Sequence, residues 1–380
     1  MSTLASLVRP GMRIALGDGV GTPRAVAAEL AAVAAATGGV RLLLGWTPAA
    51  GPALDVTAFA DVRTVMGGRG LRAAIDAGTV RALPVRLSAV PALLRGPLRP
   101  DVLVAPLVPV AGGFAFGTEV SWMGAAVAAG AVVAGAVTAG RTCCDAGPPL
   151  PSERVVVVAE TAEEPATPPY TAPSGVHREI AGRVAALVPE GARLQVGPGA
   201  LGAAVLDALR VPVQMDAGLL PDGVADLDRR GLLRGTPVAT YLAGGPALRE
   251  WADGRPLLHG VEHTHDIGRL SAQSGFVAVN TALEVDEQGQ VNVEGLPGAA
   301  VGGIGGHADY AAAASRCPDG LSVVAVPATH RGRPTLVERL SAPVSTPAHD
   351  VDVLVTEHGA ADLRGLDRGE RAAAVRALWR

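Results

Sequence analysis

The sequence contains no lysine, so all 32 basic side chains among its 380 residues are arginines. Schiff-base catalysis and the phosphate-binding G-x-x-x-x-G-K-[ST] loop both require a lysine. Pyridoxal enzymes, lysine aldolases and ordinary P-loop nucleotide hydrolases are therefore excluded. The 36 acidic side chains leave a formal charge of -4. Binding of nucleic acid through bulk positive charge is excluded as well.

Cysteine is also scarce, with only Cys143, Cys144 and Cys317 in the chain. An odd number without a C-x-x-C pair favours neither a disulfide framework nor a thiolate zinc site, so we expect a cytoplasmic protein. Residues Met1 to Pro10 show no secretory signal pattern. The uncharged run Trp122 to Gly140 is long enough for a membrane span, but its Ala, Gly and Val residues favour a buried helix followed by a buried strand. We expect no membrane association.

Short β-branched runs alternate with alanine-rich stretches along the chain, a pattern typical of an α/β fold with largely parallel strands. The expected strands include Val155–Val158, Arg193–Val196, Phe276–Val279, Leu321–Val326 and Val351–Val355. Residues 160–175 are rich in Pro, Thr and acidic residues, the composition of an exposed linker. We predict an N-terminal domain over 1–160, a linker over 161–175 and a C-terminal domain over 176–380.

Two segments of the sequence resemble one another, residues 10–30 and residues 190–209. Each reads as a small turn, a strand, a glycine-rich loop and an alanine-rich helix. The repeat predicts a tandem of two similar Rossmann-like α/β domains. The alternative is chance similarity between stretches that are both rich in Ala and Gly.

The loop Gly197 to Gly202 fits the pattern G-x-G-x-x-G after a predicted strand, and Asp222 follows about 20 residues later. This pattern makes an NAD(P)-binding oxidoreductase an alternative. However, Pro198 removes one amide donor, and Asp18 in the corresponding loop of the first repeat would repel a phosphate. A tight turn between strand and helix is the other interpretation of the loop.

A second glycine cluster, Gly302 to Gly306, has four glycines in five residues. Its backbone amides are suited to close approach of a carbonyl oxygen or a phosphate. It lies between two further motifs, Asn280 to Asn292 (NTALEVDEQGQVN) and Val355 to Gly365 (VTEHGAADLRG). With these three segments the chain resembles the acetyl-CoA hydrolase/transferase family of class I CoA transferases, which includes acetate/4-hydroxybutyrate CoA-transferases.

The resemblance implies two tandem CoA-transferase-type α/β domains with the site in the cleft between them. It implies a small acyl-CoA and a carboxylate as substrates, no permanently bound cofactor, no nucleic-acid partner, and a homo-oligomer. In such enzymes a glutamate attacks the thioester while glycine amides stabilise the oxyanion. By resemblance, the oxyanion and CoA-facing amides here are those of Gly303, Gly305 and Gly306.

The sequence departs from the family pattern at the nucleophile. The catalytic glutamate is expected four residues before the Asp222–Gly223 turn, and that position is Gly218. The nearest carboxylate is Asp216, two residues out of register and one methylene shorter, which makes it a candidate for a displaced nucleophile. Any one of Glu284, Asp286 and Glu357 would serve instead as a general base for water, the alternative for these three being structural salt bridges with arginines. The remaining alternative is a member of the family that binds acyl-CoA, or assembles with a partner, without catalysis.

Several residues, all but one of them polar, are candidates for the lining of the substrate pocket. They are Gly218, His263, His265, Asp266, Asn280, Glu284 and Glu357. We expect His263 and His265 on one face of a strand, where two side chains at i and i+2 point the same way. No further ligand set accompanies them, so we expect no metal site.

Overall fold

The computed structural model describes residues 3–48, 54–140 and 143–380. The chain divides into two compact units, Met1–Pro168 with Ala239–His263 and Pro169–Val238 with Thr264–Arg380. The first boundary falls inside the predicted linker. Residues 239–263, which the sequence assigned to the C-terminal domain, belong to the first unit.

The first unit is built on an eight-stranded sheet in the order β4-β3-β2-β1-β5-β7-β8, with β6 paired to β5. All pairs are parallel except β5 with β6. The strands are β1 (Arg13–Leu16), β2 (Arg41–Leu44), β3 (Asp61–Thr64), β4 (Arg81–Ala82), β5 (Val102–Val110), β6 (Gly113–Ala115), β7 (Val132–Val137) and β8 (Val155–Glu160). The apolar runs of β1 and β5 fit a parallel sheet that is covered on both faces.

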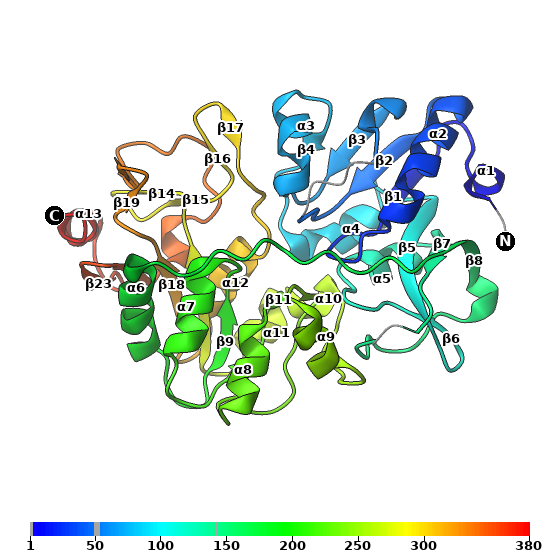
Figure 1. The fold of residues 1–380 in the computed structure, drawn as a ribbon. Helices are drawn as coiled ribbons and strands as arrows, with labels where there is room; N and C mark the ends of the chain where they lie inside the picture. Colours follow the sequence, from blue (N-terminus) through cyan, green and yellow to red (C-terminus); the bar gives the residue numbers. More distant parts are fainter. Residues whose placement is uncertain (1–2, 49–53, 141–142) are drawn as a thin grey trace. The chain divides into compact units, whose positions relative to one another are not determined.

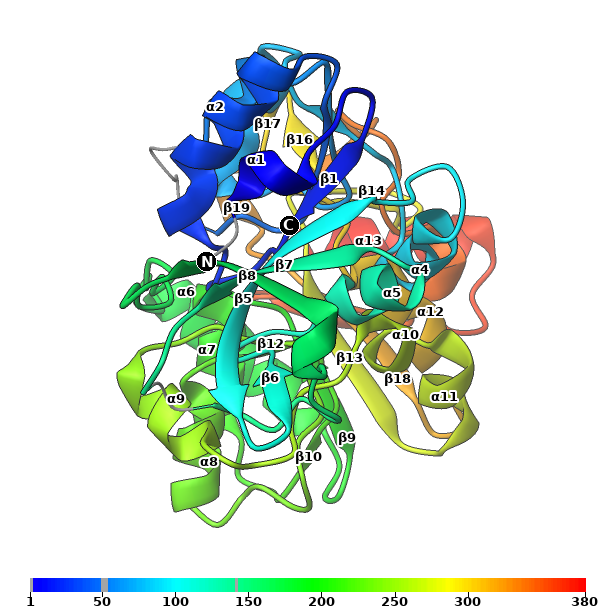
Figure 2. The same ribbon diagram turned by 90° about the vertical axis from the view of Figure 1, so that its right-hand side faces the viewer.

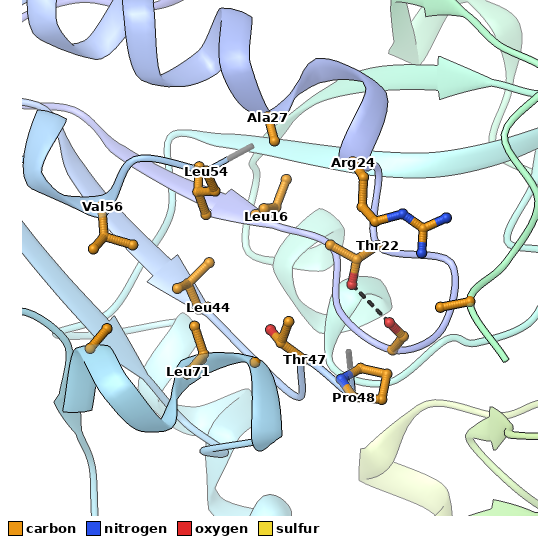
Figure 3. A pocket seen from close by; sticks show the side chains of 14 residues that line it. Leu16, Thr22, Arg24, Ala27, Leu44, Thr47, Pro48, Leu54, Val56 and Leu71 are labelled. Carbon is orange, nitrogen blue, oxygen red and sulfur yellow. Dashed lines mark hydrogen bonds between the residues drawn. The ribbon is translucent and has the colours of Figure 1, made fainter. Parts of the chain in front are cut away.

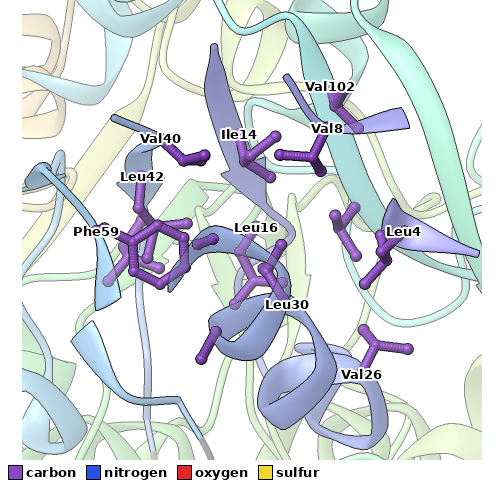
Figure 4. Close-up of a cluster of buried hydrophobic side chains, with 14 of the residues drawn as sticks. Leu4, Val8, Ile14, Leu16, Val26, Leu30, Val40, Leu42, Phe59 and Val102 are labelled. Carbon is purple, nitrogen blue, oxygen red and sulfur yellow. The ribbon is translucent and has the colours of Figure 1, made fainter. Parts of the chain in front are cut away.

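Helices of the first unit are short. They are α1 (Leu4–Leu7), α2 (Ala27–Thr37), α3 (Arg72–Asp76), α4 (Val90–Leu94), α5 (Met123–Ala128), α9 (Pro246–Ala252) and α10 (Val261–Thr264), whose last residue belongs to the second unit, with the 3₁₀ turns η1 (Arg24–Val26), η2 (Val56–Ala58), η3 (Arg69–Leu71), η4 (Leu87–Ala89) and η5 (Ser152–Arg154). Helices α1 and α2 lie side by side (Figures 1 and 2). Leu30 of α2 packs into a cluster with Ile14, Leu42 and Phe59 (Figure 4).

The uncharged run that begins at Trp122 forms α5 and then β7, and both elements are largely buried. The prediction of a buried helix followed by a buried strand is therefore confirmed. No helix in the part of the chain that the structure describes is long and apolar enough to cross a membrane.

The second unit is built on a six-stranded sheet in the order β10-β9-β13-β18-β22-β23, parallel except for the last pair. Its strands are β9 (Arg193–Val196), β10 (Gln214–Met215), β13 (Phe276–Thr281), β18 (Leu321–Ala325), β22 (Val353–Thr356) and β23 (Gly359–Asp362). Its helices are α6 (Gly175–Ala186), α7 (Ala200–Ala208), α8 (Gly223–Arg229), α11 (Ile267–Ala272), α12 (His307–Ala314) and α13 (Arg368–Ala377). The strands expected in this region are confirmed, with β22 starting two residues later than predicted.

Short strands and one 3₁₀ turn complete the chain. They are β11 (Leu219–Leu220), β12 (Tyr241–Leu242), β14 (Glu284–Asp286), β15 (Val291–Asn292), β16 (Gly295–Leu296), β17 (Ala299–Ala300), β19 (Thr329–His330), β20 (Arg333–Pro334), β21 (Leu336–Val337) and η6 (Ala348–Asp350). The motif Asn280 to Asn292 thus covers the end of β13, all of β14 and β15, and the turn between them.

The two repeated segments have the same local structure. Gly11 and Gly191 adopt φ values of +79° and +78° in the turns that precede β1 and β9. After each strand the first glycine of the loop donates its amide to a neighbouring strand, Gly17 to the carbonyl of Val104 and Gly197 to that of Val279. Equivalent turns and equivalent loop anchors support a true repeat over chance similarity of composition.

Candidate functional site

The glycine loop of the first unit uses its amides within the protein. Gly19 donates to the carbonyl of Trp46 at 2.8 Å, and Gly21 donates to Oε2 of Glu119 at 3.2 Å. A Cβ on Gly19 would lie 2.7 Å from the same Glu119 oxygen, so the backbone passes this carboxylate too closely for a side chain. The loop therefore acts as a structural turn around Glu119, which opposes binding of a phosphate there.

Asp18, the acid in that loop, is buried at the centre of a hydrogen-bond cluster. Its Oδ2 accepts hydrogen bonds from the Tyr241 hydroxyl at 2.8 Å and from the Ser121 hydroxyl, the Trp122 indole and the Trp46 amide, each at 3.1 Å. Burial raises the pKa of Asp18 to about 6, and the four donors oppose that shift. The sequence identified Asp18 only as a charge unfavourable to phosphate.

Asp18 should give the stability of the protein a measurable dependence on pH. Its pKa of about 6 lies above the ordinary value of an aspartate, so between about pH 4 and pH 6 the folded state holds a proton that the unfolded state has released. The contribution of Asp18 therefore falls as pH rises through this range, by roughly 3 kcal/mol in total. In urea titrations at pH 4 to 7, the free energy of unfolding of Asp18→Asn, relative to that of the wild type, should increase by that amount as the pH rises. If the stabilities of the wild type and Asp18→Asn change with pH in parallel, the raised pKa of Asp18 is contradicted. Asp76→Asn on α3 is the control for replacing an aspartate.

The loop after β9 also serves a packing role. Gly199 has a φ of +103°, and a Cβ on Gly202 would collide with the carbonyl oxygen of Gly197. Helix α7 thus approaches its own strand so closely that only glycine fits at its first turn. These contacts favour the interpretation of the loop as a tight turn between strand and helix.

The third glycine loop, Gly302 to Gly306, leads into helix α12. Gly302 donates to the carbonyl of Glu294 at 3.1 Å. Among the described residues, no hydrogen bond takes up the amides of Gly303, Gly305 or Gly306, which directly precede α12. Gly305 has a φ of +57°. Unused amides at a helix N-terminus can receive a developing negative charge.

Two aromatic side chains face Gly306 and Gly218 together. A Cβ on Gly306 would lie 2.5 Å from Cε2 of Tyr310 and 2.7 Å from Nε2 of His265. A Cβ on Gly218 would lie 3.0 Å from the Tyr310 hydroxyl and 3.1 Å from the same His265 nitrogen. The structure therefore brings three sequence-predicted residues, Gly218, His265 and Gly306, around one shared point. Tyr310 was not predicted, although its position one turn after Gly306 on α12 could have indicated it.

His265 and Tyr310 are neutral at physiological pH. Burial lowers the pKa of His265 to about 3, with the charge of Arg269 acting in the same direction. Burial raises the pKa of Tyr310 well above its ordinary value. The Nδ1 atom of His265 forms a 2.8 Å hydrogen bond with the Thr264 hydroxyl, and the two rings lie 4.9 Å apart between centroids. The neighbourhood of Gly218 thus contains hydrogen-bonding groups that do not change charge near neutral pH.

Gly306→Ala should destabilise the protein by about 1–3 kcal/mol, because the added methyl group forces Tyr310 and His265 out of their packed positions. Denaturant unfolding measures this loss. The matched control is Gly302→Ala in the same loop, where the nearest atom to a new Cβ lies at 3.8 Å. Equal stability of the two variants would show that the rings do not pack against Gly306.

Asp216 is held by two arginines. Its Oδ2 accepts from Arg193 at 3.2 Å and from Arg269 at 2.9 Å, and its Oδ1 accepts from Arg269 at 2.7 Å. The Asp216 side chain is only 7% exposed. Both carboxylate oxygens are therefore engaged in ion pairs, which opposes a role as a displaced nucleophile. That role remains an untested prediction.

The other predicted pocket residues are engaged locally. Glu284 accepts hydrogen bonds from Asn292 and from the amide and hydroxyl of Ser341. Glu357 accepts from the Ala328 amide at 2.8 Å. Asn280 contacts Gln195 at 3.5 Å. These contacts stabilise turns and strand ends, and a role in substrate binding stays a prediction.

The strand expected at His263 and His265 is wrong. His263 lies in helix α10 of the first unit with its ring 4.6 Å from that of His259, whereas His265 belongs to the second unit. Asp266 caps the N-terminus of α11 by accepting from the amides of Gly268 and Arg269. Two short helices in succession, the second started by an aspartate cap, replace the strand.

Residues 244–378 match the model of the acetyl-CoA hydrolase/transferase C-terminal domain. The resemblance seen in the sequence motifs is thereby confirmed. Within this domain lie Gly306, His265 and Tyr310, whereas Gly218 precedes the matched range.

Curated proteins that are similar to this chain support the same resemblance. The chain is 29% identical over 216 residues to a 4-hydroxybutyrate coenzyme A transferase of Clostridium kluyveri, a match covering 53% of this chain and 50% of that protein. It is 28% identical over 252 residues to an acetyl-CoA hydrolase of Saccharomyces cerevisiae, covering 59% and 46%. The chain thus spans about half the length of the curated relatives that it matches.

Solved structures show the fold. RipA from Yersinia pestis has a TM-score of 0.89 at 23% identity over 99% of this chain and 92% of that chain. A 4-hydroxybutyrate CoA-transferase from Porphyromonas gingivalis has a TM-score of 0.76 at 22% identity, with the same coverage of both chains. The predicted fold class, tandem CoA-transferase-type α/β domains with largely parallel sheets, is confirmed.

Proposed function

We propose that the protein is an enzyme acting on thioesters of coenzyme A with small acyl groups. The observation that carries this proposal is the match of residues 244–378 to a domain whose relatives are CoA transferases and acetyl-CoA hydrolases. The unused amides of Gly305 and Gly306 support it, because they can stabilise the oxyanion formed at a thioester carbonyl. The acyl-CoA enters as a substrate, and no permanently bound cofactor is part of the proposal.

Hydrolysis is the reaction that the local geometry favours. Gly218 has no carboxylate, and both oxygens of Asp216 are engaged by arginines, so a covalent glutamyl thioester has no evident site. In hydrolysis a water oxygen attacks the carbonyl carbon, the carbon–sulfur bond breaks, and the CoA thiolate leaves and takes a proton. Direct attack by an acceptor carboxylate would instead form a mixed anhydride and release the CoA thiolate. Attack of that thiolate on the acceptor's carbonyl carbon would then give the new thioester and release the original acyl group as a carboxylate.

A second candidate function is binding of acyl-CoA without turnover. The closeness of His265 and Tyr310 to Gly218 favours it, because these rings occupy the space into which a side chain at position 218 would extend.

We further propose a cytoplasmic homo-oligomer. The three cysteines are free, and burial raises the pKa of Cys143 to about 11 and of Cys144 to about 12. Unpaired protonated thiols suit a reducing compartment.

The test is incubation with acetyl-CoA, with and without propionate, followed by mass spectrometry of the CoA species and of the protein. Free CoA without propionate and without a protein adduct would support hydrolysis. Propionyl-CoA that forms only with propionate would support transfer, and an adduct on Asp216 would restore it as nucleophile. No turnover, combined with thermal stabilisation by acetyl-CoA, would favour the binding function. If the protein neither turns over acetyl-CoA nor is stabilised by it, the proposal is contradicted.

A further inference from the structure

The two repeated segments allow the strand ends of the two units to be compared residue by residue. Gly17 after β1 donates its amide to the carbonyl of Val104 on β5, and Gly197 after β9 donates to that of Val279 on β13. β1 therefore corresponds to β9, and β5 corresponds to β13. In the first unit the carboxyl end of β1 borders a pocket with a mostly apolar lining that includes Leu16 (Figure 3).

The same place in the second unit is polar. When the strands are aligned on the two glycine amides, Gln195 stands where β1 has Ala15, and Asn280 stands where β5 has Ala105. Both alanines are fully buried, and Gln195 and Asn280 are each only 4% exposed. Burial of a side-chain amide costs free energy unless its hydrogen bonds are formed. Because the first unit builds the same strands with alanines, packing of the sheet alone does not account for the two amides.

The two amides satisfy each other only in part. Nε2 of Gln195 donates to Oδ1 of Asn280 at 3.5 Å. Oε1 of Gln195 and Nδ2 of Asn280 are both buried, and no hydrogen bond from the described residues reaches either atom. The side chain of Asn280 thus keeps its N–H donors free while its oxygen is engaged.

These free donors lie near the start of α12. Asn280 shares a face of β13 with Ala278, which packs in one cluster with Tyr310 of α12. The next residue, Thr281, accepts a hydrogen bond at 3.0 Å from Nε2 of His307, the first residue of α12. This bond ties the end of β13 to the helix directly after the glycine loop. The donors of Asn280 therefore stand at the same end of α12 as the unused amides of that loop.

We propose that Gln195 is a positioning residue for Asn280. By engaging the oxygen of the Asn280 amide, Gln195 keeps the N–H donors of that amide directed toward the oxygen of a thioester carbonyl bound at the glycine loop. The inference rests on the proposed function, in which this oxygen becomes negatively charged during the reaction. Without Gln195 the amide of Asn280 is free to rotate and to present its own oxygen, which would repel that charge.

Steady-state kinetics with acetyl-CoA test the proposal through the rate of CoA release, or of propionyl-CoA formation if the protein is a transferase. Gln195→Met keeps the size of the side chain and removes its hydrogen-bonding groups. It should lower kcat about tenfold or more and leave KM within about twofold, because the interaction is made mainly in the transition state. Asn280→Ala should lower kcat about a hundredfold, as the loss of one oxyanion donor does.

The double variant shows whether Gln195 acts through Asn280. Gln195→Met should have no further effect on kcat in the Asn280→Ala background, because the side chain that it positions is already gone. Fully additive losses would overturn the proposal. An unchanged kcat in the single variant Gln195→Met would overturn it as well.

Ser322→Ala is the matched control for loss of a buried hydrogen bond in the same sheet. Ser322 on β18 is fully buried, and its hydroxyl donates to the carbonyl of Asp350 at 2.6 Å. The substitution should lower the urea midpoint of unfolding without changing kcat per folded molecule. If Ser322→Ala loses as much of its kcat as Gln195→Met, weakening of the sheet explains both losses and the positioning role is overturned.

The same measurements separate this inference from the proposed function. Turnover by the wild type with an equal kcat in Gln195→Met would contradict the inference and leave the proposed function standing. A wild type without any turnover would contradict the proposed enzyme, and the positioning role with it. Turnover that falls in Gln195→Met, with KM unchanged and no further loss in the double variant, would support both.

Discussion

Asp216→Ala is expected to destabilise the protein by about 3–5 kcal/mol. The substitution leaves two guanidinium groups, of Arg193 and Arg269, without the carboxylate that both contact. The Arg193 side chain is only 9% exposed, and a buried charge that loses its partner is costly. The guanidinium of Arg193 also donates to the carbonyls of Leu270 and Gln273. Loss of the ion pair should therefore loosen the end of α11 as well as β10.

Urea titration of wild type and variant measures this loss. Asp207→Ala is the matched control, because Asp207 lies exposed on α7 of the same unit. A variant Asp216→Ala as stable as this control would show that the ion pairs contribute nothing. Asp216→Asn retains the size of the side chain, and it should lose stability without changing the rate at which CoA is released per folded molecule. A loss of rate exceeding a hundredfold in folded Asp216→Asn would instead favour the nucleophile.

Part of the second sheet could be predicted from the sequence because some of its strands are largely apolar runs. Phe276 to Val279 and Val353 to Val355 are buried along their whole length, and burial on both faces makes such runs easy to recognise. The glycine repeat was equally accessible, because the turns before β1 and β9 require positive φ values. The return of residues 239–263 to the first unit was not accessible, since it depends on contacts such as Tyr241 with Asp18 that are distant in sequence.

The candidate site was predicted in part. The sequence identified Gly218 as the place where a carboxylate is absent, but it could not show what fills the space. Packing of Tyr310 and His265 against two glycines depends on the meeting of α12 with the segment before α11, and no local pattern encodes that meeting. Asp216 illustrates the reverse case. Because Asp216 lies only two residues from position 218, the sequence suggested it as a substitute nucleophile. Its ion-pair partners Arg193 and Arg269 come from β9 and α11, so the sequence did not indicate that its carboxylate is engaged.

Gly218→Glu alone is expected to lose about 1–3 kcal/mol of stability and to produce no propionyl-CoA from acetyl-CoA and propionate. The new Cβ would lie 3.0 Å from the Tyr310 hydroxyl and 3.1 Å from Nε2 of His265, so the rest of the glutamate has no room without displacing a ring. A glutamate at this position is therefore not expected to support covalent chemistry by itself. Exchange activity in the single variant, without loss of stability, would contradict this account of the space around position 218.

The double variant Gly218→Glu with His265→Ala separates crowding from a chemical defect. Removal of the imidazole opens the space that the glutamate needs, so the double variant should be more stable than the sum of the two single losses predicts. A coupling of at least about 1 kcal/mol in the double-mutant cycle, measured by urea titration, is expected for groups in direct contact. If the stability losses of the two single variants simply add, His265 does not restrict the side chain at position 218. If the coupling is present and propionyl-CoA forms with an adduct on the new glutamate, the result would support the proposed oxyanion role of the Gly305 and Gly306 amides. It would also show that the packing of His265 is what keeps a glutamate at position 218 from reacting.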